Sequence, residues 1–121
     1  MTEIYTYYDG FEGEPEYIFC LYNDDYIIEK FHVWDGYFSD IINTIESDEN
    51  GWTSLAKYYQ LCMDFDNDNW KIPDIQSALY QLQNVDNSKM HFAKSHEVLK
   101  ILIEMFTRAY ENNLTIYIEY L

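Results

Sequence analysis

Three aspartates spaced two residues apart, Asp64, Asp66 and Asp68, have the spacing that most resembles a metal-binding loop. They match the first half of an EF-hand, in which alternate carboxylates supply oxygen ligands to calcium. The second half does not match, because Asn69 occupies the position that needs glycine and Ile75 the position that needs a bidentate glutamate. We therefore expect a solvent-exposed acidic loop, no bound metal and no calcium-dependent change in melting temperature.

The histidines and cysteines form no recognisable catalytic or zinc-binding pattern. His91 and His96 are five residues apart and His32 lies in a strand-like segment, so neither an HExxH helix nor a zinc knuckle is present. We expect these histidines to be ordinary polar or half-buried side chains. Cys20 and Cys62 each lie in an apolar segment, without a neighbouring His or Lys to activate the thiol. Buried, reduced thiols of this kind are typical of the cytoplasm.

Glycine is too scarce for the loops that bind nucleotides or expose a catalytic serine. Only four glycines occur, and they form no Walker loop, dinucleotide fingerprint or nucleophile elbow. Close carboxylate pairs are expected by chance among 22 acidic residues, so they carry no specific signal. We expect no enzymatic activity and no cofactor. A small enzyme remains an alternative, and it requires a concave pocket with convergent titrating groups.

Charge and aromatic content are the strongest signals in the chain. The 121 residues include 7 basic and 22 acidic side chains, for a net charge of −15, and no Lys or Arg precedes Lys30. Such a surface repels the phosphates of nucleic acids and anionic membranes. Because 48% of residues are apolar and 19% aromatic, the chain folds rather than remaining disordered. A small core cannot bury all 13 tyrosines with every hydroxyl hydrogen-bonded. We therefore expect several tyrosines to lie exposed beside carboxylates, as in protein interfaces.

The hydrophobic pattern predicts the elements that position these side chains. Strands are expected over 4–8, 17–22 and 25–33, and the last two form a hairpin around Asn23 and Asp24. Apolar spacing at helical periods predicts helices over about 37–46, from Thr53 or Ser54 onward, after Pro73, and over about 93–111. Alternating apolar residues over 114–120 predict a final strand.

This order of elements predicts a small α+β domain spanning residues 1–121. It has an N-terminal β-hairpin or meander, three to four helices, and a C-terminal strand that returns to the sheet. The first residues show no secretory signal, and no apolar run approaches the length of a membrane span. We expect a cytoplasmic protein that is a monomer or a weak dimer.

The whole-chain character resembles the immunity proteins of bacterial polymorphic toxin and contact-dependent growth inhibition systems. The segments 34–36 and 51–55 and the closing helix-to-strand stretch 97–119 reinforce it. That last stretch is also similar to the end of barstar, a ribonuclease inhibitor, in which a helix leads into a terminal parallel strand. The resemblance implies an acidic, non-enzymatic protein that neutralises a cognate basic toxin domain, with a nuclease as the expected toxin.

Loop carboxylates beside aromatic residues are the candidate contacts with such a partner, since exposed charge raises the association rate. The candidates are Asp24, Asp25, Asp48, Glu49, Asp64, Asp66, Asp68 and Trp70. The alternative function is a DNA mimic that inhibits a nucleic-acid-binding protein, which predicts two rows of carboxylates at phosphate-like spacing.

Overall fold

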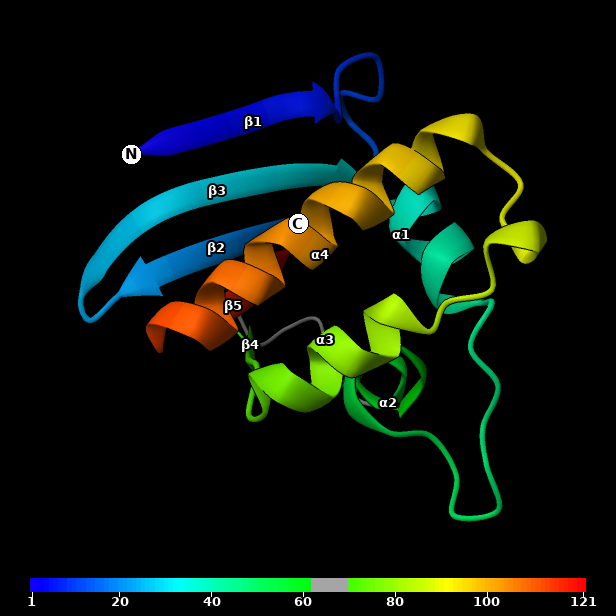
Figure 1. Cartoon of the computed structure of the whole chain (residues 1–121). Helices are drawn as coiled ribbons and strands as arrows, with labels where there is room; N and C mark the ends of the chain where they lie inside the picture. Colours follow the sequence, from blue (N-terminus) through cyan, green and yellow to red (C-terminus); the bar gives the residue numbers. More distant parts are fainter. Residues whose placement is uncertain (62–69) are drawn as a thin grey trace.

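The computed structural model of the chain describes residues 1–61 and 70–121 (Figure 1). Within them, three strands precede the helices, and a last strand follows the longest helix. The elements are β1 (Thr2–Tyr7), β2 (Glu16–Asn23), β3 (Tyr26–Trp34), α1 (Asp35–Ile42), α2 (Ser54–Leu61), β4 (Trp70–Lys71), α3 (Ile75–Gln83), a 3₁₀ turn (Asn87–Lys89), α4 (Ala93–Asn112) and β5 (Thr115–Tyr120). The predicted small α+β fold is confirmed.

The strands form one mixed sheet in the order β1-β3-β2-β5-β4. The predicted β2–β3 hairpin is confirmed, but its turn lies at Asp24 and Asp25, one residue later than the predicted Asn23 and Asp24, and Asp24 adopts a left-handed φ of 53°. The predicted return of the C-terminal strand is also confirmed, since β5 pairs with β2. β5 is antiparallel to both β2 and β4, whereas the likeness to barstar implied a parallel terminal strand. The short strand β4 was not predicted, because two residues carry no periodic signal.

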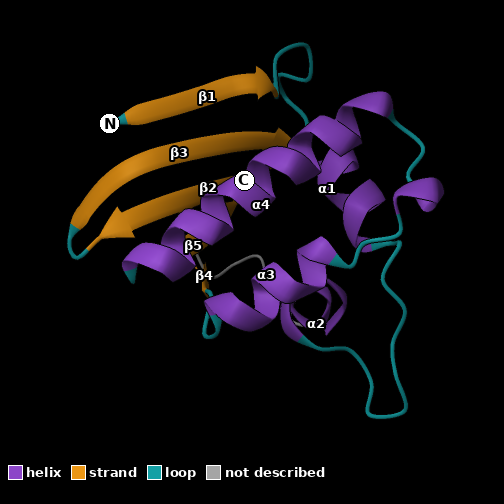
Figure 2. Cartoon of the chain, in the orientation of Figure 1, coloured by secondary structure: helices purple, strands orange, loops and turns teal. Residues whose placement is uncertain are grey.

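Side chains of successive strand residues alternate between the two faces of the sheet. One face carries Tyr17, Phe19 and Leu21 of β2, all buried in the hydrophobic core, with Phe31 of β3 and Ile116 of β5. The helices supply the rest of this core, and Figure 2 shows α4 and α3 on the same side of the strands. The sheet is therefore packed against helices on one face.

The start of α2 depends on a side chain from a distant part of the chain. The Ala56 amide near the start of α2 donates to Gln81 Oε1 (3.1 Å), and Gln81 Nε2 donates to the Thr53 carbonyl (2.9 Å). This long-range contact does the capping that the sequence assigned to Thr53 or Ser54. Helix α1 ends at Ile42, earlier than predicted, where the Thr44 hydroxyl donates to the Ile41 carbonyl (2.8 Å).

Asp40 of α1 caps the N-terminus of α4, whose own N-cap residue Phe92 offers no side-chain hydrogen bond. Its carboxylate accepts from the amides of His91 (2.9 Å) and Phe92 (3.0 Å) and from the Ser95 hydroxyl (2.7 Å). Burial of Asp40 acts to raise the carboxyl pKa, but these hydrogen bonds outweigh it and lower the pKa to about 2. The buried charge thereby ties α1 to α4.

Across residues 1–61 and 70–121, no helix combines the length and apolar character that spanning a membrane requires.

Candidate interaction surface

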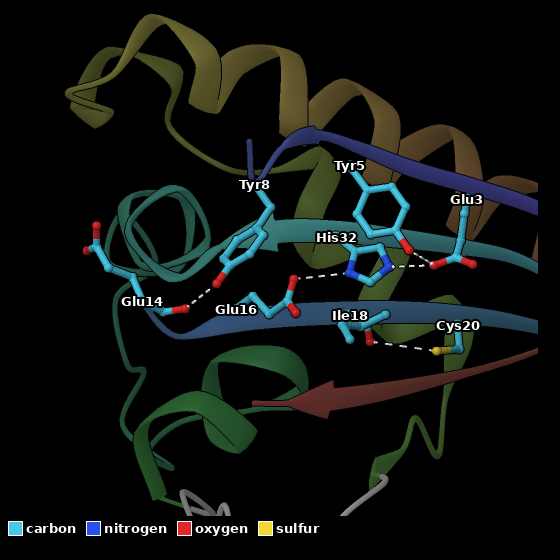
Figure 3. Close-up of polar contacts among 8 residues, drawn as sticks. All are labelled: Glu3, Tyr5, Tyr8, Glu14, Glu16, Ile18, Cys20 and His32. Atoms are coloured by element: carbon cyan, nitrogen blue, oxygen red, sulfur yellow. Dashed lines mark hydrogen bonds and ion pairs between the residues drawn. The ribbon is translucent and has the colours of Figure 1, made fainter. Parts of the chain in front are cut away.

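The face of the sheet opposite the core is covered by side chains of the strands themselves. Figure 3 looks onto this face, with helix α4 behind the strands. We call it the open sheet face and define it by the strand residues that alternate with the core residues. Its members are Glu3, Tyr5, Glu16, Ile18, Cys20, Tyr22, Lys30, His32, Lys71, Thr115, Tyr117 and Glu119.

A buried histidine lies between two carboxylates on the open sheet face (Figure 3). His32 is 6% exposed; its Nε2 is 3.0 Å from Glu3 Oε2, and its Nδ1 is 3.0 Å from Glu16 Oε2. The Tyr5 ring stacks on the imidazole at 4.2 Å, and its hydroxyl donates to Glu3. Hydrogen bonds from Tyr5 and His32 lower the pKa of Glu3. The cluster joins β1, β3 and β2 and fixes two carboxylates in place.

Tyrosines surround a buried thiol at the centre of the same face. Tyr22 and Tyr117 form an edge-to-face pair with ring centroids 5.1 Å apart. Cys20, which is directly opposite Tyr117 in the β2–β5 register, is a free thiol and is 1% exposed. Its burial raises the thiol pKa to about 11, so the sulfur is protonated and unreactive at neutral pH. Cys62 lies outside the described residues.

The loop between β1 and β2 holds carboxylates in fixed positions at one end of this face. The amide of Gly10 donates to the Glu12 carboxylate (3.1 Å). Glu14 is bound twice, because its carbonyl accepts from the Tyr8 hydroxyl (2.6 Å) and its carboxylate accepts from Trp34 Nε1 (3.2 Å). Hydrogen bonds from backbone amides lower the pKa of Glu12. Asp9, Glu12 and Glu14 are exposed, and hydrogen bonds hold the carboxylates of Glu12 and Glu14.

Stacked aromatic rings support this loop. Phe11 lies on Trp34 with ring centroids 4.0 Å apart and an interplanar angle of 7°, and Tyr37 and Phe92 meet the pair edge-on. The Trp34 indole also lies directly on Gly36, where an added Cβ would be 2.2 Å from a ring carbon. Glycine is therefore required at this position by close approach.

The sequence did not single out this loop as a contact region, although it carries Asp9, Glu12 and Glu14 beside aromatic residues. The available signal was the absence of any Lys or Arg before Lys30, which leaves these carboxylates without a basic neighbour in sequence. The hydrogen bonds that order the loop join residues up to 20 positions apart, and no local pattern reveals them.

The structure separates the contact residues that the sequence predicted. Asp24 and Asp25 are exposed at the β2–β3 turn, whereas Asp48 and Glu49 are exposed in the loop between α1 and α2. Figure 1 shows these two loops on opposite sides of the molecule. They therefore do not converge on one site.

The third predicted cluster is only partly described. Trp70 begins β4, and its ring stacks on Tyr58 at 4.2 Å with an interplanar angle of 9°. Asp64, Asp66 and Asp68, including the candidate calcium loop, lie outside the described residues. Elsewhere, within 1–61 and 70–121, no group of three or more His, Cys, Asp or Glu residues is arranged to hold a metal ion.

An open groove of about 1090 Å3 lies between α2, α3 and the segment after α1. Its described lining includes Lys57, Tyr58, Tyr80 and Lys89, and contains neither histidine nor cysteine. The residues around it supply amides, hydroxyls and charged groups, and the Ser77 hydroxyl donates to the Asp74 carboxylate (2.7 Å) at the start of α3. His96 lines a smaller hollow beside α4, and the exposed His91 ring contacts Asp40 through Nδ1 at 2.9 Å.

Comparison of the chain with family models, with curated proteins and with solved structures finds no match, so the case for a function rests on the surface described above.

Proposed function

We propose that this chain is an immunity protein that binds a basic toxin domain, with a nuclease as the expected toxin, and neutralises it by protein–protein contact. The observation that carries the proposal is where the acidic residues lie. Of the 22, three lie outside the described ranges, and of the remaining 19 only Glu29 and Asp40 are buried. The negative charge is therefore displayed on the surface.

Displayed carboxylates suit a basic partner for a physical reason. A nuclease domain binds phosphate and is therefore positively charged, so exposed carboxylates attract it at long range and raise the association rate. Carboxylates that are already ordered, such as Glu3, Glu14 and Glu16, lose little conformational entropy on binding. Tyrosines beside them supply the aromatic anchors that dominate interface energies.

The proposed function predicts that the gene of a secreted toxin directly precedes the gene of this chain, and the test uses the basic C-terminal domain of that toxin. Cells that produce the active toxin domain are expected to survive when they also produce this chain, and an inactive toxin domain is expected to co-purify with it in a one-to-one complex. Death of cells that contain soluble, folded chain at equal or higher levels, together with no co-purification, would overturn the proposal.

A further inference from the structure

The open sheet face has the composition of a docking surface for basic side chains. Tyr5 is 48% exposed, and Tyr22 and Tyr117 are partly exposed. Three carboxylates, Glu3, Glu16 and Glu119, lie among these rings, against two bases, Lys30 and Lys71. We propose that the partner of the proposed function docks on this face, an inference that rests on that function.

Tyrosine beside carboxylate is a suitable receptor for arginine and lysine. A guanidinium stacks on an aromatic ring and donates two parallel hydrogen bonds to a carboxylate, so one arginine engages both groups. Glu3 and Glu16 are held by His32, and Tyr5 is held by Glu3 and by its stacking on His32. These groups are rigid before the partner arrives.

The size of the face determines which loops must take part. The four longer strands of the sheet, about 4.8 Å apart and with about six residues each, cover roughly 400 Å2 in plan. A stable interface buries about 800 Å2 on each partner, so the contact must extend beyond the strands. The strand ends lead into two acidic rims, the β1–β2 loop with Asp9, Glu12 and Glu14, and the β2–β3 turn with Asp24 and Asp25.

The same geometry excludes one of the predicted clusters. The loop with Asp48 and Glu49 lies on the opposite side of the molecule from the β2–β3 turn (Figure 1). A partner centred on the open sheet face reaches the turn and not that loop.

Charge selects a basic partner over a second copy of this chain. Two copies would bring together surfaces that each belong to a molecule of net charge −15, and like charges facing each other across an interface are costly. A basic domain meets the acidic rims with complementary charge.

Two matched double variants test the location. Asp24→Asn with Asp25→Lys changes the β2–β3 turn, and Asp48→Asn with Glu49→Lys makes the same change in charge in the other exposed loop. Asparagine keeps a side-chain acceptor at both sites and tolerates the left-handed backbone at position 24. Because the net charge of the two variants is identical, a difference in affinity reports position rather than total charge.

Binding is measured by titration calorimetry against the inactive toxin domain. The turn variant is expected to bind at least about tenfold more weakly than the loop variant. Tyr5→Ala is expected to bind at least about tenfold more weakly than the parent, while Tyr80→Ala, on an exposed tyrosine of α3, binds as the parent does. If Tyr5→Ala unfolds, the comparison of the two charge variants alone tests the location of the interface.

Equal losses in the two charge variants, or a larger loss in the loop variant, would overturn the inference while leaving the proposed function standing. Absence of binding by the parent chain would remove the proposed function and this inference together. Light scattering measures the oligomeric state of the parent and of the turn variant. If the parent is a dimer and the turn variant is a monomer, the face binds a second copy of this chain, and the proposed basic partner is overturned.

Discussion

Replacing Asp40 with asparagine removes the charge that ties α1 to the start of α4 and nearly conserves the size of the side chain. The Asp40 side chain is 4% exposed, and its pKa is lowered from 3.8 to about 2 by hydrogen bonds that exceed the cost of burial. One pKa unit is worth about 1.4 kcal/mol, so the charged form stabilises the fold by about 2 kcal/mol at neutral pH. An asparagine NH2 group facing the same amide donors adds to the loss.

The stabilisation by the Asp40 charge depends on pH, which distinguishes it from other effects of the substitution. Because the pKa of Asp40 is lower in the folded than in the unfolded chain, its contribution is complete above about pH 4 and is lost as the pH falls through about 2. Urea unfolding at about pH 7 should show a loss of about 2–3 kcal/mol in the Asp40→Asn variant. Thermal unfolding at decreasing pH should show the gap between parent and variant closing.

The matched control is Glu104→Gln, which neutralises an exposed carboxylate on α4 and should leave stability nearly unchanged. Equal stability of the parent and Asp40→Asn at neutral pH would show that the charge of Asp40 does not stabilise the fold. A gap that persists unchanged to about pH 2 would lead to the same conclusion, because the loss would then not come from the charge.

Three further substitutions or reactions test other parts of the structure. Tyr17→Phe should leave the melting temperature unchanged or raise it, because the buried Tyr17 hydroxyl has no hydrogen-bond partner among the described residues; a loss above about 1 kcal/mol would contradict this. In a Cys62→Ser background, Cys20 should react with iodoacetamide only after unfolding, since burial raises its thiol pKa to about 11; rapid alkylation of the folded chain would be the opposite result. Gly36→Ala should displace the Trp34 ring and speed hydrogen exchange in the β1–β2 loop, and unchanged exchange with unchanged stability would contradict the contact.

The elements with strong periodicity were predictable from the sequence. The hairpin, the long helix α4 and the final strand follow from the spacing of apolar residues and from the polar Asn23-Asp24 pair, and all three are present, although the turn of the hairpin lies at Asp24 and Asp25. The capping of α2 by Gln81 and of α4 by Asp40 was not predictable, because each joins residues 25 or more positions apart. Parallel pairing of β1 with β3 likewise depends on tertiary contacts that local propensity does not encode.

The candidate interaction surface was also only partly predictable from the sequence. Composition predicted tyrosines exposed beside carboxylates, and Tyr5 beside Glu3 is an example. It did not predict which acids share a surface, because that depends on strand order. His32 was expected to be an ordinary polar or half-buried side chain, and no sequence pattern indicated that the sheet places it between Glu3 and Glu16, which come from two other strands.

The association rate of this chain with the inactive toxin domain, measured by stopped-flow at increasing ionic strength, tests most directly whether displayed charge captures a basic partner. Exposed charges are screened within about 8 Å at physiological salt, so steering weakens as salt rises. The rate should fall at least about tenfold between roughly 0.02 and 0.5 M salt, with a much smaller change in the dissociation rate. An association rate that does not change over this range would contradict the account.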